Sequence, residues 1–450
     1  MKRWLLVLGA LLALGFGARY GWSVYRRVEA PIRVGILHSR TGPLEISERS
    51  MIDAEVMALE EINAAGGLLG RRVEWLVADG RSDPVVFARE ARRLIEAEHV
   101  SVIFGCWASA TRKSVRPVVE GARHLLFYPN AYEGLEQSPQ IIYTGAAPNQ
   151  QVIPAINWCR DVLKARRFFL VGSDYVWPHC VNAVVKDQLR ALGAEVAGEF
   201  YVAFGTGADV GDAVDAIRAA RPDVIISTVA GDANRPFYRG LKGAGIEPGR
   251  TPVVAFGIAE DELRALPVED MVGDYAAWNY FQSIDRRTNR EFVQRFKARH
   301  GAERVTSDAI VAAHNSVRLW AQAVEEAGTE QTREVQKVIG DQSLDAPEGI
   351  VTIDHETQHT WRPFYLGKIR QDGQFEIVWS LEKPIRPVPY PGSRSRAEWD
   401  AFVEGLYTSW GENWFNPRRN LAPSSPPAAQ GPGGRREATR TPGVIGARRG

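Results

Sequence analysis

Short apolar runs alternate with amphipathic segments along most of the chain. Residues 32–37 form an apolar run of strand length. The apolar residues that follow recur at steps of three and four, the period of a helix, at Ile52, Val56, Leu59 and Ile62. A capping box of Ser50 and Asp53 is expected to start this helix, and the two glycines at 66 and 67 are expected to end it.

The same strand-and-helix unit repeats twice over. In the first half, strands are predicted at 73–78, 100–104 and 125–128, and helices at 84–98 and 111–121. The alternation of strands and helices begins again after residue 149. Helices are predicted there at 149–165, 180–192 and 209–220, and strands at 168–171, 195–201, 224–227 and 253–256. Helices at 287–299 and 306–327 and an antiparallel hairpin of 349–354 and 364–369 follow. This pattern predicts an α/β protein with two lobes, each a doubly wound parallel sheet.

The two ends of the chain differ from this pattern. Lys2 and Arg3 precede an apolar run over residues 4–18, which suits the core of a signal peptide. If the run is extended to Tyr25 it instead suits an uncleaved membrane anchor, although Arg19 interrupts it. Under either interpretation, the rest of the chain is expected to be exported. Residues 417–450 are rich in Arg, Pro and Gly, which predicts a disordered basic tail.

Composition excludes one class of partner. The 55 Lys and Arg residues balance 54 Asp and Glu, for a net charge of +1. A nucleic-acid-binding domain would carry a basic excess, so no nucleic acid is expected to bind. The odd number of cysteines leaves at least one thiol unpaired, and only Cys159 and Cys180, which flank a strand, are candidates for a disulfide.

Unusual side chains follow several predicted strands. Open α/β sheets bind ligands at the carboxyl ends of their strands, next to helix N-termini. The candidate ligand-binding residues at these ends are Trp107, Ser109, Tyr128, Asn130, Tyr175, Trp177 and Asp232. Aromatic rings with a few polar groups predict a small, mostly apolar pocket. The alternatives are that Trp107, Tyr128 and Trp177 are packing residues, and that Ser109 is a helix N-cap.

Motifs typical of catalysis or metal binding do not fit the predicted elements. The run from His355 to His359 matches the H-E-x-x-H pattern of zinc proteases, but that chemistry needs a helix and this run lies between two predicted strands. The sequence contains no P-loop and no nucleophile elbow. We therefore predict no catalytic residue, no metal and no cofactor, and a protein that binds rather than an enzyme.

Several ordered blocks carry a resemblance to a known family. Residues 32–410 resemble the periplasmic type I solute-binding proteins for urea and short-chain amides, and the related amide-sensing regulator of aliphatic amidase expression. The similar blocks are residues 35–39, 61–67, 104–109, 111–115, 132–134, 145–151, 172–175, 277–281 and 345–349. Asn130 and Ala131 depart from the residues expected after Tyr128 and Pro129 in both groups.

The resemblance implies a domain plan with three crossings between the lobes, near residues 147, 281 and 347. Residues 1–30 would be the signal peptide or anchor with its linker. Lobe 1 would comprise 32–147 with 282–346, lobe 2 would comprise 148–281 with 347–383, and 384–416 would form a C-terminal extension before the tail.

The resemblance also implies a function and a division of the site. Trp107, Ser109, Tyr128 and Asn130 would line the lobe 1 wall, and Tyr175, Trp177 and Asp232 the lobe 2 wall. Only Asp232 could pair with a charged ligand, which favours an uncharged one. The expected protein captures urea or a short-chain amide, in the periplasm or at the outer face of the cytoplasmic membrane, for the permease subunits of an ABC importer. The alternative is an anchored receptor that signals to a partner; an amino-acid binder or an amidase is less favoured.

Overall fold

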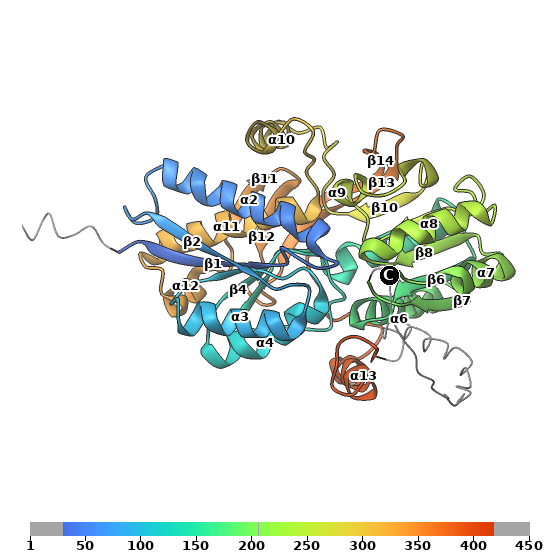
Figure 1. Cartoon of the computed structure of the whole chain (residues 1–450), viewed down its shortest axis with the longest axis horizontal. Coiled ribbons are helices and arrows are strands. Elements are labelled where there is room, and N and C mark those ends of the chain that lie inside the picture. Colours follow the sequence, from blue (N-terminus) through green and yellow to red (C-terminus); the bar gives the residue numbers. More distant parts are fainter. Residues whose placement is uncertain (1–29, 206, 418–450) are drawn as a thin grey trace, which may run out of the picture. The chain divides into compact units, whose positions relative to one another are not determined.

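The computed structural model describes residues 30–205 and 207–417, which contain two β-sheets flanked by helices (Figure 1). All strand pairs of the first sheet are parallel, in the order β2-β1-β3-β4-β5. Its strands are β1 (Ile32–His38), β2 (Val73–Asp79), β3 (Ile103–Gly105), β4 (Leu126–Tyr128) and β5 (Ile141–Tyr143). The helices between them are α2 (Glu45–Ala64), α3 (Pro84–Glu96) and α4 (Ser109–Ala122).

Different helices bury the two faces of the first sheet. Ile36 and Phe127 pack in one apolar cluster with α2 and with α11 (Asp308–Ala327), whereas their chain neighbours Leu37 and Tyr128 pack in another with α3 and α4. Adjacent residues of a strand point to opposite faces, so each strand serves both clusters. Helices on both faces of a parallel sheet are the doubly wound arrangement predicted from the sequence, and Figure 1 shows it.

The second sheet combines a parallel part with an antiparallel edge. The order is β11-β12-β13-β10-β9-β8-β6-β7, with β14 paired to β13. The pairs from β7 to β10 are parallel, and every pair beyond β10 is antiparallel. The strands are β6 (Arg167–Ser173), β7 (Glu195–Val202), β8 (Val224–Thr228), β9 (Val253–Ala255), β10 (Tyr275–Trp278), β11 (Ser343–Ala346), β12 (Gly349–Ile353), β13 (Thr360–Ile369) and β14 (Phe375–Ile385). The α/β fold class with two such sheets is confirmed.

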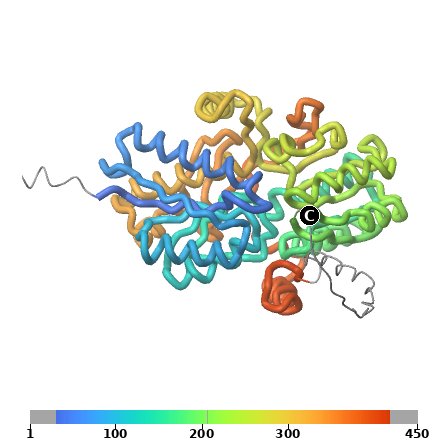
Figure 2. Tube along the Cα trace, in the orientation of Figure 1, coloured from blue at the N-terminus to red at the C-terminus, as the bar shows by residue number. Residues whose placement is uncertain are grey.

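The helices after β5 fall into three groups along the chain. Those between strands of the second sheet are η1 (Pro148–Gln150), α5 (Val152–Asp161), α6 (Val176–Ala191), α7 (Gly211–Ala220), η2 (Gly231–Ala233), α8 (Asn234–Gly243), α9 (Glu260–Leu263) and η3 (Val268–Asp270). Those that follow β10 are α10 (Arg287–His300), α11 and α12 (Thr332–Val338), and α13 (Arg396–Ser409) follows β14. In Figure 2 the light-orange trace of α11 and α12 lies among the blue and cyan segments of the first sheet, and α11 contacts α2, so the chain returns to the first lobe.

The return to the second lobe takes place in β13. Ala346, Val351 and Ile353 of the β11–β12 hairpin pack in the first lobe's core, in the same cluster as β1. The hydroxyl of Thr360 then donates to the carbonyls of Tyr143 and Thr144, at 3.4 and 3.2 Å, before β13 pairs with β10. The third crossing therefore lies near residue 360 rather than near 347, because the hairpin's apolar side chains are buried in lobe 1.

The start of α2 corrects one local expectation. The helix begins at Glu45, with Leu44 as its N-cap, so Ser50 lies inside the helix and does not cap it. Glu45 and Glu48 in the first turn complement the positive end of the helix dipole instead. The end of the helix is as predicted: Gly67 has a φ of 82° and its N–H donates to the carbonyl of Ile62 at 3.0 Å.

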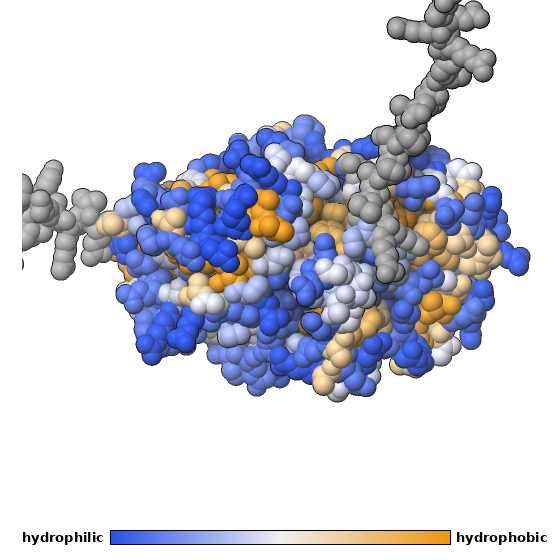
Figure 3. Space-filling view, turned by 60° about the horizontal axis from the view of Figure 1, so that its bottom comes forward, coloured by the Kyte–Doolittle hydropathy of each residue, from blue (hydrophilic) through white to orange (hydrophobic). Residues whose placement is uncertain are grey.

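The predicted signal peptide or anchor and the basic tail fall on residues 1–29 and 418–450, outside the described residues. Within 30–205 and 207–417, no helix combines the length and apolarity that a bilayer span requires. Cys106, Cys159 and Cys180 are all buried free thiols, and burial raises the pKa of each. On the face shown in Figure 3, hydrophilic residues predominate and apolar residues lie between them in small groups.

Candidate ligand cavity

A small cavity lies between the carboxyl ends of the two sheets. Strand ends of the first sheet contribute Trp107, Ser109, Asn130 and Ala131 to its lining, and strand ends of the second contribute Tyr175, Trp177, Phe256, Gly257 and Trp278. The cavity has a volume of about 10 Å³, roughly the space that one water needs. This is the position at which open α/β sheets bind ligands.

The structure brings five of the seven predicted site residues into this lining. Tyr128 lies behind the wall, where its hydroxyl donates to the carbonyl of Trp107 at 2.7 Å. The side-chain amide of Asn130 donates to the same carbonyl at 3.0 Å. Asp232 is exposed in η2 and is not part of the lining. Tyr128 therefore supports the wall, while Asp232 lies apart from the cavity.

Two buried polar atoms of the lining have no hydrogen-bond partner among the described residues. They are the carbonyl oxygen Oδ1 of Asn130, an acceptor, and the indole N–H at Nε1 of Trp177, a donor. The first turn of α4 adds backbone N–H groups, since its N-cap Ala108 has no side chain that caps them. Buried polar groups are nearly always satisfied, so these two atoms can accept and donate a hydrogen bond within the cavity.

A buried ion network fixes the wall that carries Ser109. The Ser109 hydroxyl donates to Glu133, so it does not cap the helix as the alternative interpretation had it. Arg112 binds Glu133 and Glu136, each at 2.9 Å, and Lys113 binds Glu136 at 3.1 Å. Burial opposes ionisation of Glu136, but the charges of Arg112 and Lys113 hold its pKa well below the usual value. Arg116 also lies 3.8 Å from Glu136 and pairs with Glu120 at 2.7 Å. Three cations and three carboxylates balance, so the network presents no net charge to the cavity.

Stacked rings and one close approach complete this wall. The guanidinium of Arg112 lies over the rings of Tyr128 and Tyr132, 4.7 and 4.5 Å from their centroids. At Gly145, on the first crossing, a Cβ would lie 1.9 Å from the carbonyl carbon and oxygen of Asn130. Only glycine allows the crossing strand to pass this close to the cavity residue.

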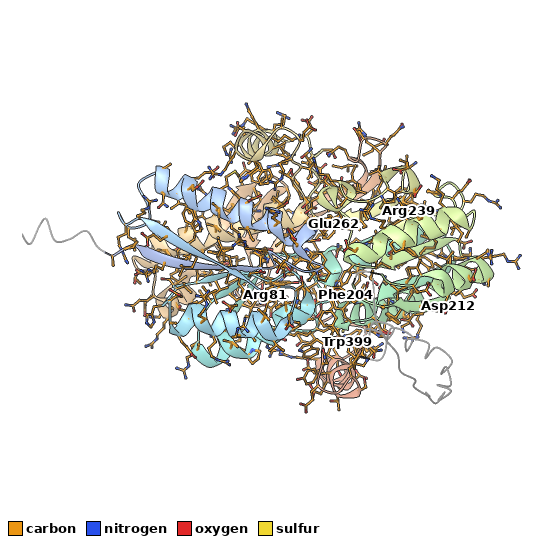
Figure 4. All side chains as sticks on the ribbon, in the orientation of Figure 1. Arg81, Phe204, Asp212, Arg239, Glu262 and Trp399 are labelled. Carbon is orange, nitrogen blue, oxygen red and sulfur yellow. The ribbon has the colours of Figure 1, made fainter. Side chains whose placement is uncertain are left out.

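The two lobes touch on either side of the cavity. Helix α4 contacts α6, and α2 contacts α9. Across the second contact, the hydroxyl of Ser47 donates to Oε1 of Glu262 at 2.7 Å, and Figure 4 shows Glu262 where the lobes meet. The structure is therefore a closed form, which explains the small volume of the cavity.

Sequence reasoning missed four lining residues, Ala131, Phe256, Gly257 and Trp278. Phe256 and Gly257 directly follow β9, and Trp278 ends β10, where its indole N–H donates to the carbonyl of Ile258 at 2.7 Å. The rule that selected the other candidates, a strand end in an α/β sheet, would also have selected Phe256 and Gly257. Trp278 lies at the end of β10, a strand that the apolar pattern does not predict, so the same rule could not have selected it.

The H-E-x-x-H run lies on a turn, as expected. His359 is fully buried and hydrogen-bonds Tyr132 and the carbonyl of Thr357, whereas His355 is 65% exposed and lies near Asp341. Burial lowers the pKa of His359 to about 4. Within the described residues, no group of His, Cys, Asp and Glu side chains is arranged to hold a metal ion.

Comparisons with curated proteins give partial and full-length matches. The chain is 32% identical over 117 residues to a limonene hydroxylase of Geobacillus stearothermophilus, of which it spans about a fifth (21%), using 26% of its own length. It spans half (50%) of an amino acid binding protein of Pseudomonas aeruginosa, with 22% identity over 193 residues and 41% of its own length. With a Leu/Ile/Val-binding protein homolog of Brucella abortus it shares 22% identity over 404 residues, covering 82% of this chain and 95% of that protein.

Solved structures share the fold. A solute-binding protein of an ABC transporter from Rhodopseudomonas palustris, in complex with 3,4-dihydroxybenzoic acid, superposes with a TM-score of 0.71 at 20% identity, covering 79% of this chain and 99% of that one. The family model of the periplasmic binding protein domain matches residues 32–396, which include both sheets and the cavity. The chain belongs to the periplasmic binding protein family.

Proposed function

We propose that the chain captures a small uncharged amide, such as acetamide or urea, in the cavity and delivers it to an ABC permease outside the cytoplasmic membrane. The observation that carries the proposal is the pair of unsatisfied buried atoms. Asn130 Oδ1 needs a donor and Trp177 Nε1 needs an acceptor. A primary amide offers an N–H and a C=O on adjacent atoms, so one small molecule could satisfy both.

The charge of the cavity supports an uncharged ligand. Its lining contains no charged side chain, and the nearby Arg112 and Lys113 are paired with Glu133 and Glu136. A free amino acid would bring an ammonium and a carboxylate into this space. Burying either charge without a partner is costly, so the lining disfavours amino acids.

Size supports the same conclusion. The closed cavity has room for about one water, so even acetamide requires the walls to move outward slightly. A ligand of few atoms requires the smallest displacement. Tight capture of such a ligand depends on both lobes surrounding it, because a small molecule offers little area to one wall alone.

One observation favours a second candidate, an aromatic acid. Five of the nine lining residues are aromatic: Trp107, Tyr175, Trp177, Phe256 and Trp278. These rings could hold a flat ring, and the free N–H groups that begin α4 could bind a carboxylate. The similar Rhodopseudomonas palustris protein was solved with 3,4-dihydroxybenzoic acid. This candidate requires a much larger opening of the cavity.

Delivery to a permease rests on membership in the periplasmic binding protein family. The alternative role, a receptor held on the membrane by the N-terminal segment, uses the same cavity and the same ligand. Exposure on the outer side of the cytoplasmic membrane is common to both roles. A permease partner is supported if the ligand-loaded chain, and not the ligand-free chain, stimulates ATP hydrolysis by a reconstituted ABC importer.

Calorimetric titration tests the ligand class. Acetamide, urea, 4-hydroxybenzoate and leucine would be titrated into the wild-type chain and into Trp177→Phe, which keeps a ring but removes the indole N–H. We expect acetamide or urea to bind, and Trp177→Phe to weaken that binding by up to about tenfold, the loss of one hydrogen bond.

Trp320→Phe is the matched control. Trp320 is also buried with an unpartnered Nε1 among the described residues, but it packs in the first lobe's core, away from the cavity. Its replacement should leave the affinity unchanged. Binding of 4-hydroxybenzoate alone would support the second candidate, and binding of leucine alone would contradict the proposal of an uncharged ligand.

A further inference from the structure

The C-terminal extension ends in a short segment, residues 410–416, that lies against the cavity's second wall. We call it the strap. The family model ends at residue 396, so the strap and nearly all of α13 lie beyond the domain that the family shares. Helix α13 is held against α6. Arg394, just before α13, makes two hydrogen bonds to Asp187 of α6, at 2.7 and 2.9 Å. Trp399 of α13, labelled in Figure 4, is fully buried.

The strap pairs with the loop between β6 and α6 and with the start of α6, which together carry the cavity residues Tyr175 and Trp177. The N–H of Val176 donates to the carbonyl of Trp414 at 3.0 Å, and the N–H of Asn416 donates to the carbonyl of Asp174 at 3.2 Å. Between these bonds, Phe415 forms an antiparallel bridge with Tyr175. This is a short piece of β-pairing, and it fixes the backbone from which Tyr175 and Trp177 project.

Ring contacts strengthen this pairing. The ring of Phe415 stacks on that of Tyr175, with centroids 5.4 Å apart and an angle of 25°, and it also contacts Phe204 at 4.9 Å. The side-chain amide of Asn416 donates to Oδ2 of Asp174 at 3.0 Å. Tyr175 is therefore held between the cavity on one side and Phe415 on the other.

The strap also reaches the first lobe. The ammonium of Lys113, on α4, lies 5.1 Å from the centroid of the Trp414 ring. The same Trp414 offers its carbonyl to α6, and its ring packs on Tyr407 of α13 at 4.4 Å. Trp414 thus connects α4, the wall that carries Ser109, with α6, the wall that carries Trp177.

We propose that the strap is a latch for the closed cavity. When the lobes separate, α4 moves away from α6. The contacts of residues 414–416 with the loop before α6 and with α6 stay intact, because they lie within one lobe. The contact between Lys113 and Trp414 joins the two lobes, so it must break. Trp414 therefore favours the closed form, while Phe415 and Asn416 position Tyr175. The proposal rests on the cavity being the ligand site, but it concerns an equilibrium that also exists without ligand.

Distance measurements between spin labels on the ligand-free, full-length chain test the latch. The exposed Arg89 on α3 and Asp212 on α7 would be replaced by cysteine and labelled, since the three native thiols are buried. In Trp414→Ala we expect the ratio of long to short interlobe distances to rise, on the order of fivefold, as the loss of a cation–π contact predicts. Trp414→Phe keeps an aromatic face and should restore most of the short distance.

Two further variants separate a latch from a general loss of structure. Phe402→Ala removes a ring of α13 that contacts Trp399 and Arg394, on the second lobe's side of the extension, and should leave the distances unchanged. Asn416→Ala is a mild change that removes a bond holding the strap to Asp174, which leaves Trp414 less firmly placed against Lys113. It should shift the distances in the direction of Trp414→Ala, and it tests the latch if Trp414→Ala does not fold. Wild-type distances in both strap variants would overturn the proposal. Failure of amides to bind would not overturn the latch, because the distances are measured without ligand.

Discussion

Arg362 and Asp308 form a fully buried bidentate ion pair, with guanidinium-to-carboxylate distances of 2.8 and 3.1 Å. The pair lies where all three crossings meet. Arg362 belongs to β13, the third crossing, and it also donates to the carbonyl of Thr144 on the first at 3.2 Å. The backbone amides of Asn279 and Tyr280, on the second, hydrogen-bond to Asp308. A single ion pair therefore ties together the segments that must bend when the lobes move.

Replacement of Arg362 by methionine should destabilise the protein strongly. The change leaves Asp308 and Glu348 buried without their cation, which typically costs about 3–5 kcal/mol of unfolding free energy. Chemical denaturation followed by circular dichroism measures it. The control is Arg370→Met, which removes an exposed pair with Asp372 and should cost less than about 1 kcal/mol. Equal losses in the two variants would show that the buried pair has no special role.

Much of the fold could be predicted because most strands of the two parallel sheets are rich in apolar residues and helices follow them at a regular spacing. The pattern also missed two long elements, β14 with 11 residues and α13 with 14, because no strand is predicted beyond residue 369 and the extension from 384 on is assigned from its Pro, Gly and Arg content. Other missed elements are short or compositionally weak. β5 and β10 have three and four residues, too few for a clear period. α8 contains Pro236, Gly240 and Gly243, which have low helix propensity, and it forms because Phe237 and Leu241 are buried.

The candidate site, like the fold, could be predicted only in part. Five predicted residues line the cavity because the carboxyl ends of parallel strands lie along one edge of each sheet. Asp232 follows a strand too, but η2 leaves its side chain in solvent, and no pattern in the sequence fixes the direction of a single helical turn. The strap could not be predicted either, because its partners Tyr175 and Lys113 are more than two hundred residues away.

Gly257→Ala should weaken ligand binding by reducing the space in the cavity. A methyl group there would lie 3.3 Å from the carbonyl oxygen of Val229 and 3.6 Å from the ring of Trp177, so it fits with a small adjustment. We expect an increase in Kd of about tenfold, or ~1.4 kcal/mol, measured by calorimetry with acetamide. Gly243→Ala is the control: its methyl group meets open space at the end of α8, so it should leave Kd unchanged. An unchanged Kd in Gly257→Ala would place the ligand elsewhere.

The positions of Asn130 and Asp232 predict opposite results for two polar substitutions. Asn130→Leu removes the unsatisfied acceptor from the cavity and should raise the Kd for acetamide by up to about tenfold. Asp232→Ala changes an exposed side chain outside the lining and should have little effect. Calorimetry on both variants checks this. A larger loss in Asp232→Ala would mean that η2 turns toward the ligand on binding.

Stability should fall as the pH rises from about 4.5 to 8. The pKa of Glu260 is raised to about 8, mainly by burial. The charges of Asp308 and Glu262 raise it further, whereas a hydrogen bond from the N–H of Gln282 opposes the rise. In that range the folded protein keeps this proton while the unfolded chain loses it, so the unfolding free energy decreases. Buried neutral histidines such as His359, with a pKa of about 4, act in the opposite direction, but only below their ordinary pKa of 6.5.

His38 should extend this decrease to higher pH. Its burial would lower its pKa, but Glu55 and Glu48 raise it to about 10, so its stabilising contribution is complete below about 6.5 and is lost as the pH rises through 10. Denaturation at pH 5 to 9 would compare the wild type with Glu260→Gln, which removes one group with a raised pKa and leaves His38 and Asp274, whose burial raises its pKa to about 8. The slope above pH 6.5 should be shallower in the variant, and identical slopes would show that Glu260 ionises normally.

A crystal structure of the chain grown with saturating acetamide tests the central claim most directly. The proposal predicts electron density for one amide between the two sheets, with its N–H on Asn130 Oδ1 and its carbonyl within hydrogen-bond distance of Trp177 Nε1. The lobes should remain in contact through Ser47 and Glu262. If calorimetry shows binding while the density lies outside this cavity, or while the amide touches only one lobe, the account of capture between two lobes is contradicted.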